Sequence, residues 1–292
     1  MTDEPKQEMV VTPWEVKGDI DYDKLIEQFG VSRMTPEIED KIAEHAGYKH
    51  LQLRRGVYLS HRDTEWWIKE YEKGNKVGLY TGRGPSGNVH LGHLVPWFFC
   101  AYLQKAFGAD MYFQMTDDEK FLHRADLSLD EAVSYAYENA LDVIACGMAP
   151  GKTHIFSDTE DIEHLYKIAL RVAKKVTFST AKAVFGLTDS DNIGKIWYPA
   201  MQAMTCFLES DREGRNIPCL IPAAIDQDPY WRVTRDIAQK LGYYKPAQIH
   251  AKFLPGLAEG GKMSASQPET AIFTTDPPKK AGKKVMRAFT GG

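Results

Sequence analysis

The stretch YTGRGPSGNVHLGHLVPW, residues Tyr80–Trp97, holds three glycines at the spacing GxGxxG and two histidines at the spacing HxxH. It overlaps the apolar run VGLYT (Val77–Thr81), which has the composition of a strand, and leads into a largely apolar helix predicted over Leu91–Phe107. A glycine-rich loop between a strand and a helix is where α/β folds commonly bind nucleotides. The stretch therefore predicts a parallel sheet with a ligand site near this loop.

Strand-like and helical runs alternate further along the chain. DMYFQMT (Asp110–Thr116) and KTHIFSD (Lys152–Asp158) are predicted strands. The helix between them has Ser128 as N-cap, Glu131 to complete a capping box and Gly147 as its stop. This βαβαβ order, at about 30 to 40 residues per unit, predicts a doubly wound parallel sheet with right-handed crossovers. Its ligand should lie at the carboxyl ends of the strands.

The chain divides into two predicted parts. Residues 1–75 form an N-terminal appendix rich in Glu and Lys, and residues 76–292 form a Rossmann-like α/β domain. A mainly helical insertion over about residues 159–215 interrupts the second part. The sheet then resumes with a strand in IPCLIPAAID, a helix in DPYWRVTRDIAQKLG and a last strand in AQIHAKFLP.

Composition limits the classes of partner. The net charge of −4 argues against binding polyanions through bulk charge, so nucleic acid would need a local patch such as KKAGKKVMR (Lys279–Arg287), which is equally well a solvated charge run. The four cysteines form no CxxC pair, and the acidic N-terminus lacks the pattern of a signal peptide. The apolar run Leu94–Tyr102 is too short to span a membrane. We predict a cytoplasmic protein without a membrane span.

Two familiar nucleotide loops fit the first stretch poorly. A dinucleotide fold needs its helix to begin inside the glycine motif, whereas Pro85, Asn88 and Gly92 delay the helix until about Leu91. No single acidic residue ends the next strand as a ribose ligand would. A Walker A loop would need lysine where Asn88 stands.

The two histidines are interpreted together with a second motif. His90 and His93 could share a helix face and bind a metal, but no third ligand can be named, so we predict no metal site. GGKMSAS (Gly260–Ser266) is a glycine-loosened loop with one lysine and two hydroxyls. Such a loop suits a phosphate clamp, and histidines at a helix N-terminus suit charge that develops on the same phosphate.

Together, HLGH and KMSAS resemble the HIGH and KMSKS signatures of class I aminoacyl-tRNA synthetases. HLGH has leucine in place of isoleucine, at a position that only packs. Over about residues 10–292 the chain is similar to tryptophanyl-tRNA synthetases of the archaeal and eukaryotic type. The motifs that carry this resemblance are YTGRGPS, QMTDDEK (Gln114–Lys120), FGLTDSDNIGK (Phe185–Lys195), AIDQDPYWRVTRD (Ala224–Asp236) and KMSAS.

The resemblance implies an activity. In this family the carboxylate of tryptophan attacks the α-phosphate of ATP, and the tryptophanyl group then passes to tRNA(Trp). It also implies Mg²⁺ that arrives with ATP, and a homodimer formed through the inserted helices. A tyrosyl-tRNA synthetase and a non-catalytic synthetase-like binding module remain the alternatives.

The same resemblance implies roles for individual residues. Those at the ATP end would be His90, His93 and Arg83 on the phosphates, Gly92 beside adenine, and Lys262, Ser264 and Ser266 on the leaving pyrophosphate. Those at the amino-acid end would be Tyr80 and Gln114 at the indole, with Glu119, Gln202 and Gln227 at the ammonium and carboxylate groups. Ser266 and Glu269 also fit a capping box for a following helix.

Two expectations concern the ends of the sequence. The family's helical anticodon-binding domain would follow where the chain stops at RAFTGG, so we expect intact tryptophan activation and reduced tRNA charging. VTPWEV (Val11–Val16) resembles a segment that caps ATP in eukaryotic-type enzymes; a loose strand with an exposed Trp14 is the alternative.

Overall fold

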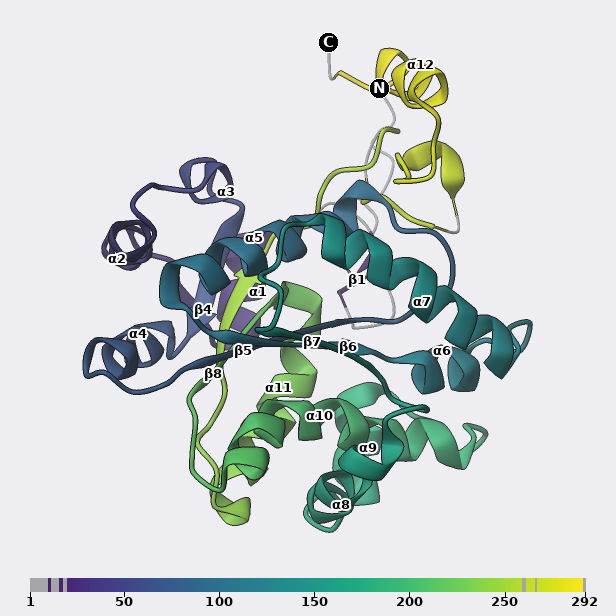
Figure 1. The fold of residues 1–292 in the computed structure, drawn as a ribbon. Helices are drawn as coiled ribbons and strands as arrows, with labels where there is room; N and C mark the ends of the chain where they lie inside the picture. Colours follow the sequence, from purple (N-terminus) through teal and green to yellow (C-terminus); the bar gives the residue numbers. More distant parts are fainter. Residues whose placement is uncertain (1–9, 12–15, 18–19, 259–260, 266, 291–292) are drawn as a thin grey trace.

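A seven-stranded sheet runs through the middle of the computed structural model, which describes residues 10–11, 16–17, 20–258, 261–265 and 267–290 (Figure 1). Five neighbouring strands are parallel, and two strands at one edge are antiparallel to their neighbours. The order across the sheet is β3 (Ser32–Arg33), β4 (Tyr58–Arg62), β9 (Ala247–Ala251), β8 (Cys219–Ala224), β5 (Gly78–Arg83), β6 (Asp110–Met115) and β7 (Thr153–Ser157). The predicted doubly wound α/β fold is confirmed.

Helices cover both faces of this sheet. Figure 1 shows α5 and α7 on one face and α8, α9, α10 and α11 on the other. The helices in chain order are α1 (Tyr22–Phe29), α2 (Pro36–Ala46), α3 (Leu51–Arg54), α4 (Thr64–Glu72), α5 (Leu91–Phe107), α6 (Asp117–His123), α7 (Leu129–Ala145), α8 (Ile162–Ala173), α9 (Phe178–Phe185), α10 (Ile193–Glu213), α11 (Asp228–Ala238) and α12 (Pro278–Met286). Short 3-10 turns occupy Ile225–Gln227, Gln239–Leu241 and Pro268–Thr270, and β1 (Val10–Val11) pairs with β2 (Val16–Lys17). Trp14 lies outside the described residues.

Local signals placed several elements correctly. Helix α5 begins at Leu91, as the delayed start in the sequence predicts. In the capping box of α7, the Glu131 backbone N–H donates to Ser128 Oγ across 3.2 Å, and the Ser128 N–H donates to the Glu131 carboxylate across 2.9 Å. Gly147 takes a left-handed φ of 83° just beyond this helix. Helices α8, α9 and α10 lie between β7 and β8, in the range of the predicted helical insertion.

The central strand β6 shows why the sheet is buried on both faces. Met111 and Phe113 pack into the core cluster beneath α5, whereas Tyr112 packs into the cluster beneath α10. Successive side chains of a strand point to opposite faces, so a strand covered by helices on both sides must be apolar throughout. The central run Met111–Phe113 meets that demand, whereas the buried Gln114 is a polar exception that is hydrogen-bonded to Asp158.

The N-terminal region contributes strands that the sequence analysis did not anticipate. β4 pairs antiparallel with β9, with Ser60 opposite His250, and Arg62 holds Asp228 through two hydrogen bonds of 2.7 and 2.9 Å. The predicted domain boundary near residue 75 stays a prediction. None of the described helices combines the length and the apolarity that a membrane crossing needs. The four cysteines are free thiols.

Candidate active site

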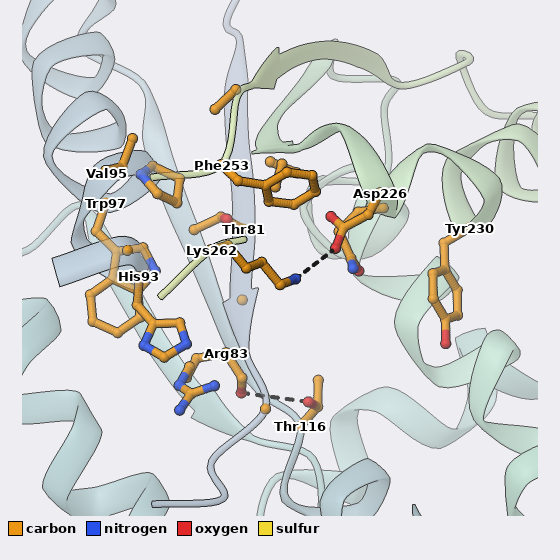
Figure 2. A pocket seen from close by; sticks show the side chains of 18 of the residues that line it. Thr81, Arg83, His93, Val95, Trp97, Thr116, Asp226, Tyr230, Phe253 and Lys262 are labelled. Atoms are coloured by element: carbon orange, nitrogen blue, oxygen red, sulfur yellow. Dashed lines mark hydrogen bonds and ion pairs between the residues drawn. The ribbon is translucent and has the colours of Figure 1, made fainter. Parts of the chain in front are cut away.

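A cavity of about 540 Å³ opens at the carboxyl ends of the parallel strands. Its walls come from the end of β5, the start of α5, the β6–α6 junction, the ends of β8 and β9, and the segment 262–265. Figure 2 shows side chains from these elements converging on it. This is the edge at which doubly wound sheets bind their ligands, and it is where the sequence analysis placed the site.

Most of the predicted site residues meet in this cavity. Gln114 is fully buried directly behind Tyr80 and is not part of the wall. Ser266 lies outside the described residues, and the short 3-10 turn after it has Gln267 as its N-cap, so the capping box with Glu269 is not the helix start seen here. The residues that do line the cavity are Tyr80, Arg83, His90, Gly92, His93, Glu119, Gln202, Gln227, Lys262 and Ser264.

The two histidines open helix α5. His90 is the N-cap, and its backbone N–H donates to His93 Nδ1 across 3.2 Å. The two rings stack with centroids 3.7 Å apart. Burial, helped by the positive charge of Arg83, lowers the pKa of His90 to about 4 and that of His93 well below its usual value. Both rings are therefore neutral hydrogen-bonding groups near pH 7.

Gly92 stands directly against the first of these rings. A Cβ at this position would lie 3.0 Å from Cε1 and Nδ1 of His90, which is tighter than ordinary packing allows. Glycine is therefore required if the His90 ring is to keep its place. The predicted role of Gly92 beside adenine stays a prediction.

Arg83 ends strand β5 and brings a positive charge to the cavity. Its Nε donates to Asn139 Oδ1 of α7 across 3.2 Å, whereas Nη2 is buried without a hydrogen-bond partner among the described residues. Burial lowers the pKa of this guanidinium to about 10, against the opposing effect of Glu119 and Asp142. An unpaired buried donor of this kind is costly, so the group is poised for an anionic ligand.

Lys262 reaches into the cavity from the KMSAS segment. Its Nζ lies 4.6 Å from the ring centroid of Phe253 and 3.7 Å from Oδ2 of Asp226 (Figure 2). The second distance is an ion pair but too long for a hydrogen bond. Burial raises the pKa of Asp226, and Lys262 opposes that rise. The lysine is thus held loosely and can change partner when a phosphate enters.

The deep end of the cavity is a chain of polar groups within an aromatic wall. The Tyr80 hydroxyl donates to Gln114 Oε1 across 2.5 Å, and Gln114 Nε2 donates to both carboxyl oxygens of Asp158 across 2.8 and 2.9 Å. Burial raises the pKa of Tyr80 and of Asp158. Trp231 packs edge-on against the Tyr80 ring at a centroid distance of 5.3 Å. Figure 2 shows Tyr230 on the same side of the cavity as Asp226.

Glu119, in the first turn of α6, also lines the cavity. Its carboxylate accepts from Thr116 Oγ1 across 3.2 Å and from Lys120 Nζ across 2.8 Å. A side chain on Gly84 would come within 2.7 Å of the same carboxylate. The glycine-rich loop after β5 therefore leaves room for an acidic group in the wall.

Sequence reasoning missed several wall residues. Asp226 lies two residues after β8, and Thr116 directly follows β6, so their position at the carboxyl ends of parallel strands was a usable signal. Phe253 and Trp231 read as ordinary core residues, and nothing in the local pattern marks them.

A metal-binding cluster is absent from this cavity in the described residues. Among the described residues, the one group of three potential metal ligands is Asp110, Glu209 and Glu213, none of which lines the cavity. Asp110 begins β6, at the other end of the strand from the cavity, and Lys76 pairs with all three carboxylates. A lysine therefore already occupies this cluster and offsets part of its negative charge.

Comparisons with known proteins agree with this geometry. Residues 72–292 match the family model of class I tRNA synthetases (W and Y). A tryptophan--tRNA ligase of Sulfurisphaera tokodaii is 53% identical over 98% of this chain and 74% of its own length. The structure of a tryptophanyl-tRNA synthetase from Encephalitozoon cuniculi bound to tryptophan is 37% identical, with a TM-score of 0.86 over 93% of this chain and 79% of that one. The Plasmodium falciparum tryptophanyl-tRNA synthetase is 42% identical, with a TM-score of 0.86 over 94% and 73%. The chain therefore belongs to the class I tRNA synthetases of the tryptophan and tyrosine family.

Proposed function

We propose that this chain is a tryptophan--tRNA ligase, which activates L-tryptophan with ATP and transfers it to tRNA(Trp). The observation that carries the proposal is one cavity with His90, His93, Arg83 and Lys262 at one end and the Tyr80–Gln114 pair at the other. The names of the relatives support the choice of amino acid. They give no support to the tyrosyl alternative.

At the ATP end, the residues act by charge and position. Lys262 and Arg83 supply full positive charges, and the neutral rings of His90 and His93 supply hydrogen bonds where negative charge develops on the phosphates. The attacking group is the carboxylate of the amino acid itself, so the protein needs no nucleophile of its own. Ser264 and Ser266 complete the proposed pyrophosphate site.

Enzymes of this family use ATP together with a divalent metal ion. We propose that this ion is Mg²⁺, which would supply charge neutralisation on the phosphates when bound. It would enter with ATP, because the described carboxylate cluster Asp110, Glu209 and Glu213 is at the far end of β6 and is filled by Lys76.

At the amino-acid end, the pocket must satisfy an indole N–H, which only donates. Tyr80 provides an oxygen acceptor at the wall, and Gln114, buried behind it, accepts the hydrogen of the Tyr80 hydroxyl. Glu119 would pair with the ammonium group, and Gln202 and Gln227 would bind the polar end of the amino acid. A non-catalytic module would have no need of the phosphate end, which argues against that alternative.

The assembly proposed is a homodimer. Tyr137, Leu141 and Ile144 form an exposed apolar stripe on α7, each with 62% of its surface open. Tyr137 also donates to Glu160 just before α8, which carries an exposed stripe of its own in Ile162, Tyr166 and Leu170. Contiguous exposed apolar stripes are typical of protein–protein interfaces. Sedimentation of the wild type and of Leu141→Asp tests the proposed dimer interface. Equal masses of the two proteins at all concentrations would contradict it.

A cytoplasmic location is proposed with the free cysteines as support.

The function is tested by exchange of labelled pyrophosphate into ATP with each aromatic amino acid in turn. We expect tryptophan to drive exchange, with phenylalanine rejected by roughly 10⁴-fold because the buried acceptors would be left unpaired. Faster exchange with tyrosine than with tryptophan would overturn the assignment.

A further inference from the structure

Hydrogen bonds run from the deep end of the cavity into the sheet in one direction. Tyr80 donates to Gln114, and Gln114 donates to Asp158. All three side chains are at most 2% exposed. Asp158 does not touch the cavity, yet it is the end of the chain that begins at the cavity wall.

The carboxyl group of Asp158 determines which way the Gln114 amide faces. An amide can present either its NH₂ or its oxygen to a neighbour, and the neighbours decide between the two. Both oxygens of Asp158 lie within 2.9 Å of Gln114 Nε2, so the NH₂ group must face Asp158. Gln114 Oε1 then faces Tyr80, and the phenol must donate to it across 2.5 Å.

A fourth residue keeps Asp158 an acceptor. Asp118 hydrogen-bonds to Asp158, and burial together with this charge raises the pKa of Asp158, while burial raises that of Asp118 to about 7. The pair therefore holds a proton between its two carboxyl groups near neutral pH. This hydrogen bond raises the pKa of Asp158 and lowers that of Asp118, so Asp158 donates the shared proton to Asp118 and its oxygens keep lone pairs that accept from Gln114.

The consequence appears at the cavity wall. With its only hydrogen committed to Gln114, the Tyr80 oxygen can offer only a lone pair to a ligand. Thr205 lies beside the same hydroxyl and lowers its pKa, as a hydrogen bond to the oxygen does, and the carbonyl of Gln202 is a second, weaker acceptor at 3.2 Å. Aligned hydrogen bonds also polarise one another, which strengthens the accepting end.

We propose that Asp158 is a positioning residue for substrate selection: through Gln114 it fixes Tyr80 as an acceptor, so that the pocket selects an aromatic side chain with an N–H donor. The inference rests on the proposed function, in which that donor is the indole of tryptophan. Asp158 acts without touching the substrate. Its contribution is to the direction of a hydrogen bond and not to the shape of the pocket.

The test compares tryptophan with 3-benzothienylalanine, in which sulfur replaces the indole N–H at nearly the same shape. In Asp158→Asn, the new NH₂ group would face the NH₂ group of Gln114, and two donors cannot hydrogen-bond to each other. The Gln114 amide therefore turns over, and its NH₂ group donates to the Tyr80 oxygen. We expect the ratio of kcat/KM for tryptophan over benzothienylalanine, measured by pyrophosphate exchange, to fall by about tenfold. A purely structural defect would lower both substrates equally and leave the ratio unchanged.

Asp117→Asn is the matched control. Asp117 is as buried as Asp158 and accepts from Ser157 and Thr159, but it makes no hydrogen bond to Gln114. Its replacement should reduce stability while the substrate ratio is kept. If Asp158→Asn does not fold, Asp158→Glu and Asp158→Gln repeat the comparison with two side chains of equal length. The preference for tryptophan over benzothienylalanine should then fall only in Asp158→Gln.

The outcomes separate two failures. A wild-type chain that shows no exchange with tryptophan overturns the proposed function and the inference with it. If the wild type prefers tryptophan and Asp158→Asn shows the same preference, the proposed function stands and only the inference about Asp158 is overturned.

Discussion

The backbone N–H of Leu91, the first residue of α5, donates to the carbonyl oxygen of Ile272 across 3.0 Å. Thr274 N–H returns a bond of 3.0 Å to Val89, and His90 forms an antiparallel bridge with Phe273 between them. The segment that follows KMSAS is therefore attached to the segment that opens the histidine helix. Two motifs at opposite ends of the sequence form one structural unit over the cavity.

This attachment holds the second motif, with Lys262, beside the helix that carries His90 and His93, in one cavity wall. We expect Lys262→Ala to slow adenylate formation by about 10² to 10³-fold while tryptophan binding is nearly unchanged, because the lysine acts on charge that develops in the transition state. Single-turnover kinetics and equilibrium binding of tryptophan measure the two effects. Lys283→Ala, an exposed lysine on α12, is the control. Unchanged single-turnover rates in Lys262→Ala would remove the residue from the mechanism.

Arg83→Met should separate function from stability. The guanidinium is enclosed, and among the described residues its Nη2 has no partner and its one side-chain hydrogen bond goes to Asn139. Replacing such a charge by an apolar side chain of similar length often costs little, so we expect the free energy of unfolding to change by less than about 1 kcal/mol. The rate of tryptophan activation by ATP should fall by about 10²-fold. Urea unfolding and the KM for ATP test this, and a large loss of stability would show that Arg83 is structural.

Gly92→Ala should disturb the first histidine. The added Cβ would lie 3.0 Å from the His90 ring, which must shift by a few tenths of an ångström. We expect the KM for ATP to rise about tenfold with tryptophan binding unaffected, since small displacements of positioning groups are costly. Gly282→Ala on α12 meets nothing within 4 Å and serves as the control, with unchanged kinetics. Equal kinetics in both variants would contradict the role of close packing at Gly92.

The Asp118–Asp158 pair predicts a dependence of stability on pH. Burial raises the pKa of Asp118 from 3.8 to about 7, with Asp117 and Glu119 adding to the rise. The folded state therefore binds a proton more tightly than the unfolded state. The resulting stabilisation is complete below about pH 4 and is lost as the pH rises through about 7. In Asp118→Asn this loss should disappear.

Urea midpoints at pH 4, 5.5 and 7.5 measure the effect. The wild type should lose stability relative to Asp118→Asn along this series. If the difference in urea midpoint between the two proteins is the same at all three pH values, Asp118 does not take up a proton in the folded state.

The sequence by itself determined the elements whose signals are local. The start of α5 at Leu91 and the capping box of Ser128 and Glu131 follow from residues within one helical turn of each other. The alternation of strands and helices determined the parallel sheet, and the order of the strands placed HLGH and KMSAS at the same edge. These features need no knowledge of distant contacts.

Only the tertiary structure decided what depends on packing between distant segments. The pairing of β4 with β9 joins residues nearly two hundred positions apart, and five residues such as YLSHR carry no pattern that selects that partner. Gln114 was expected beside the indole, but the fold sets it behind Tyr80, where Asp158 orients it. The ion pair of Lys262 with Asp226 likewise exists only because the ends of β8 and β9 are adjacent. The residue types for the chemistry are written in the sequence, whereas the direction of each hydrogen bond is fixed by neighbours that the fold brings together.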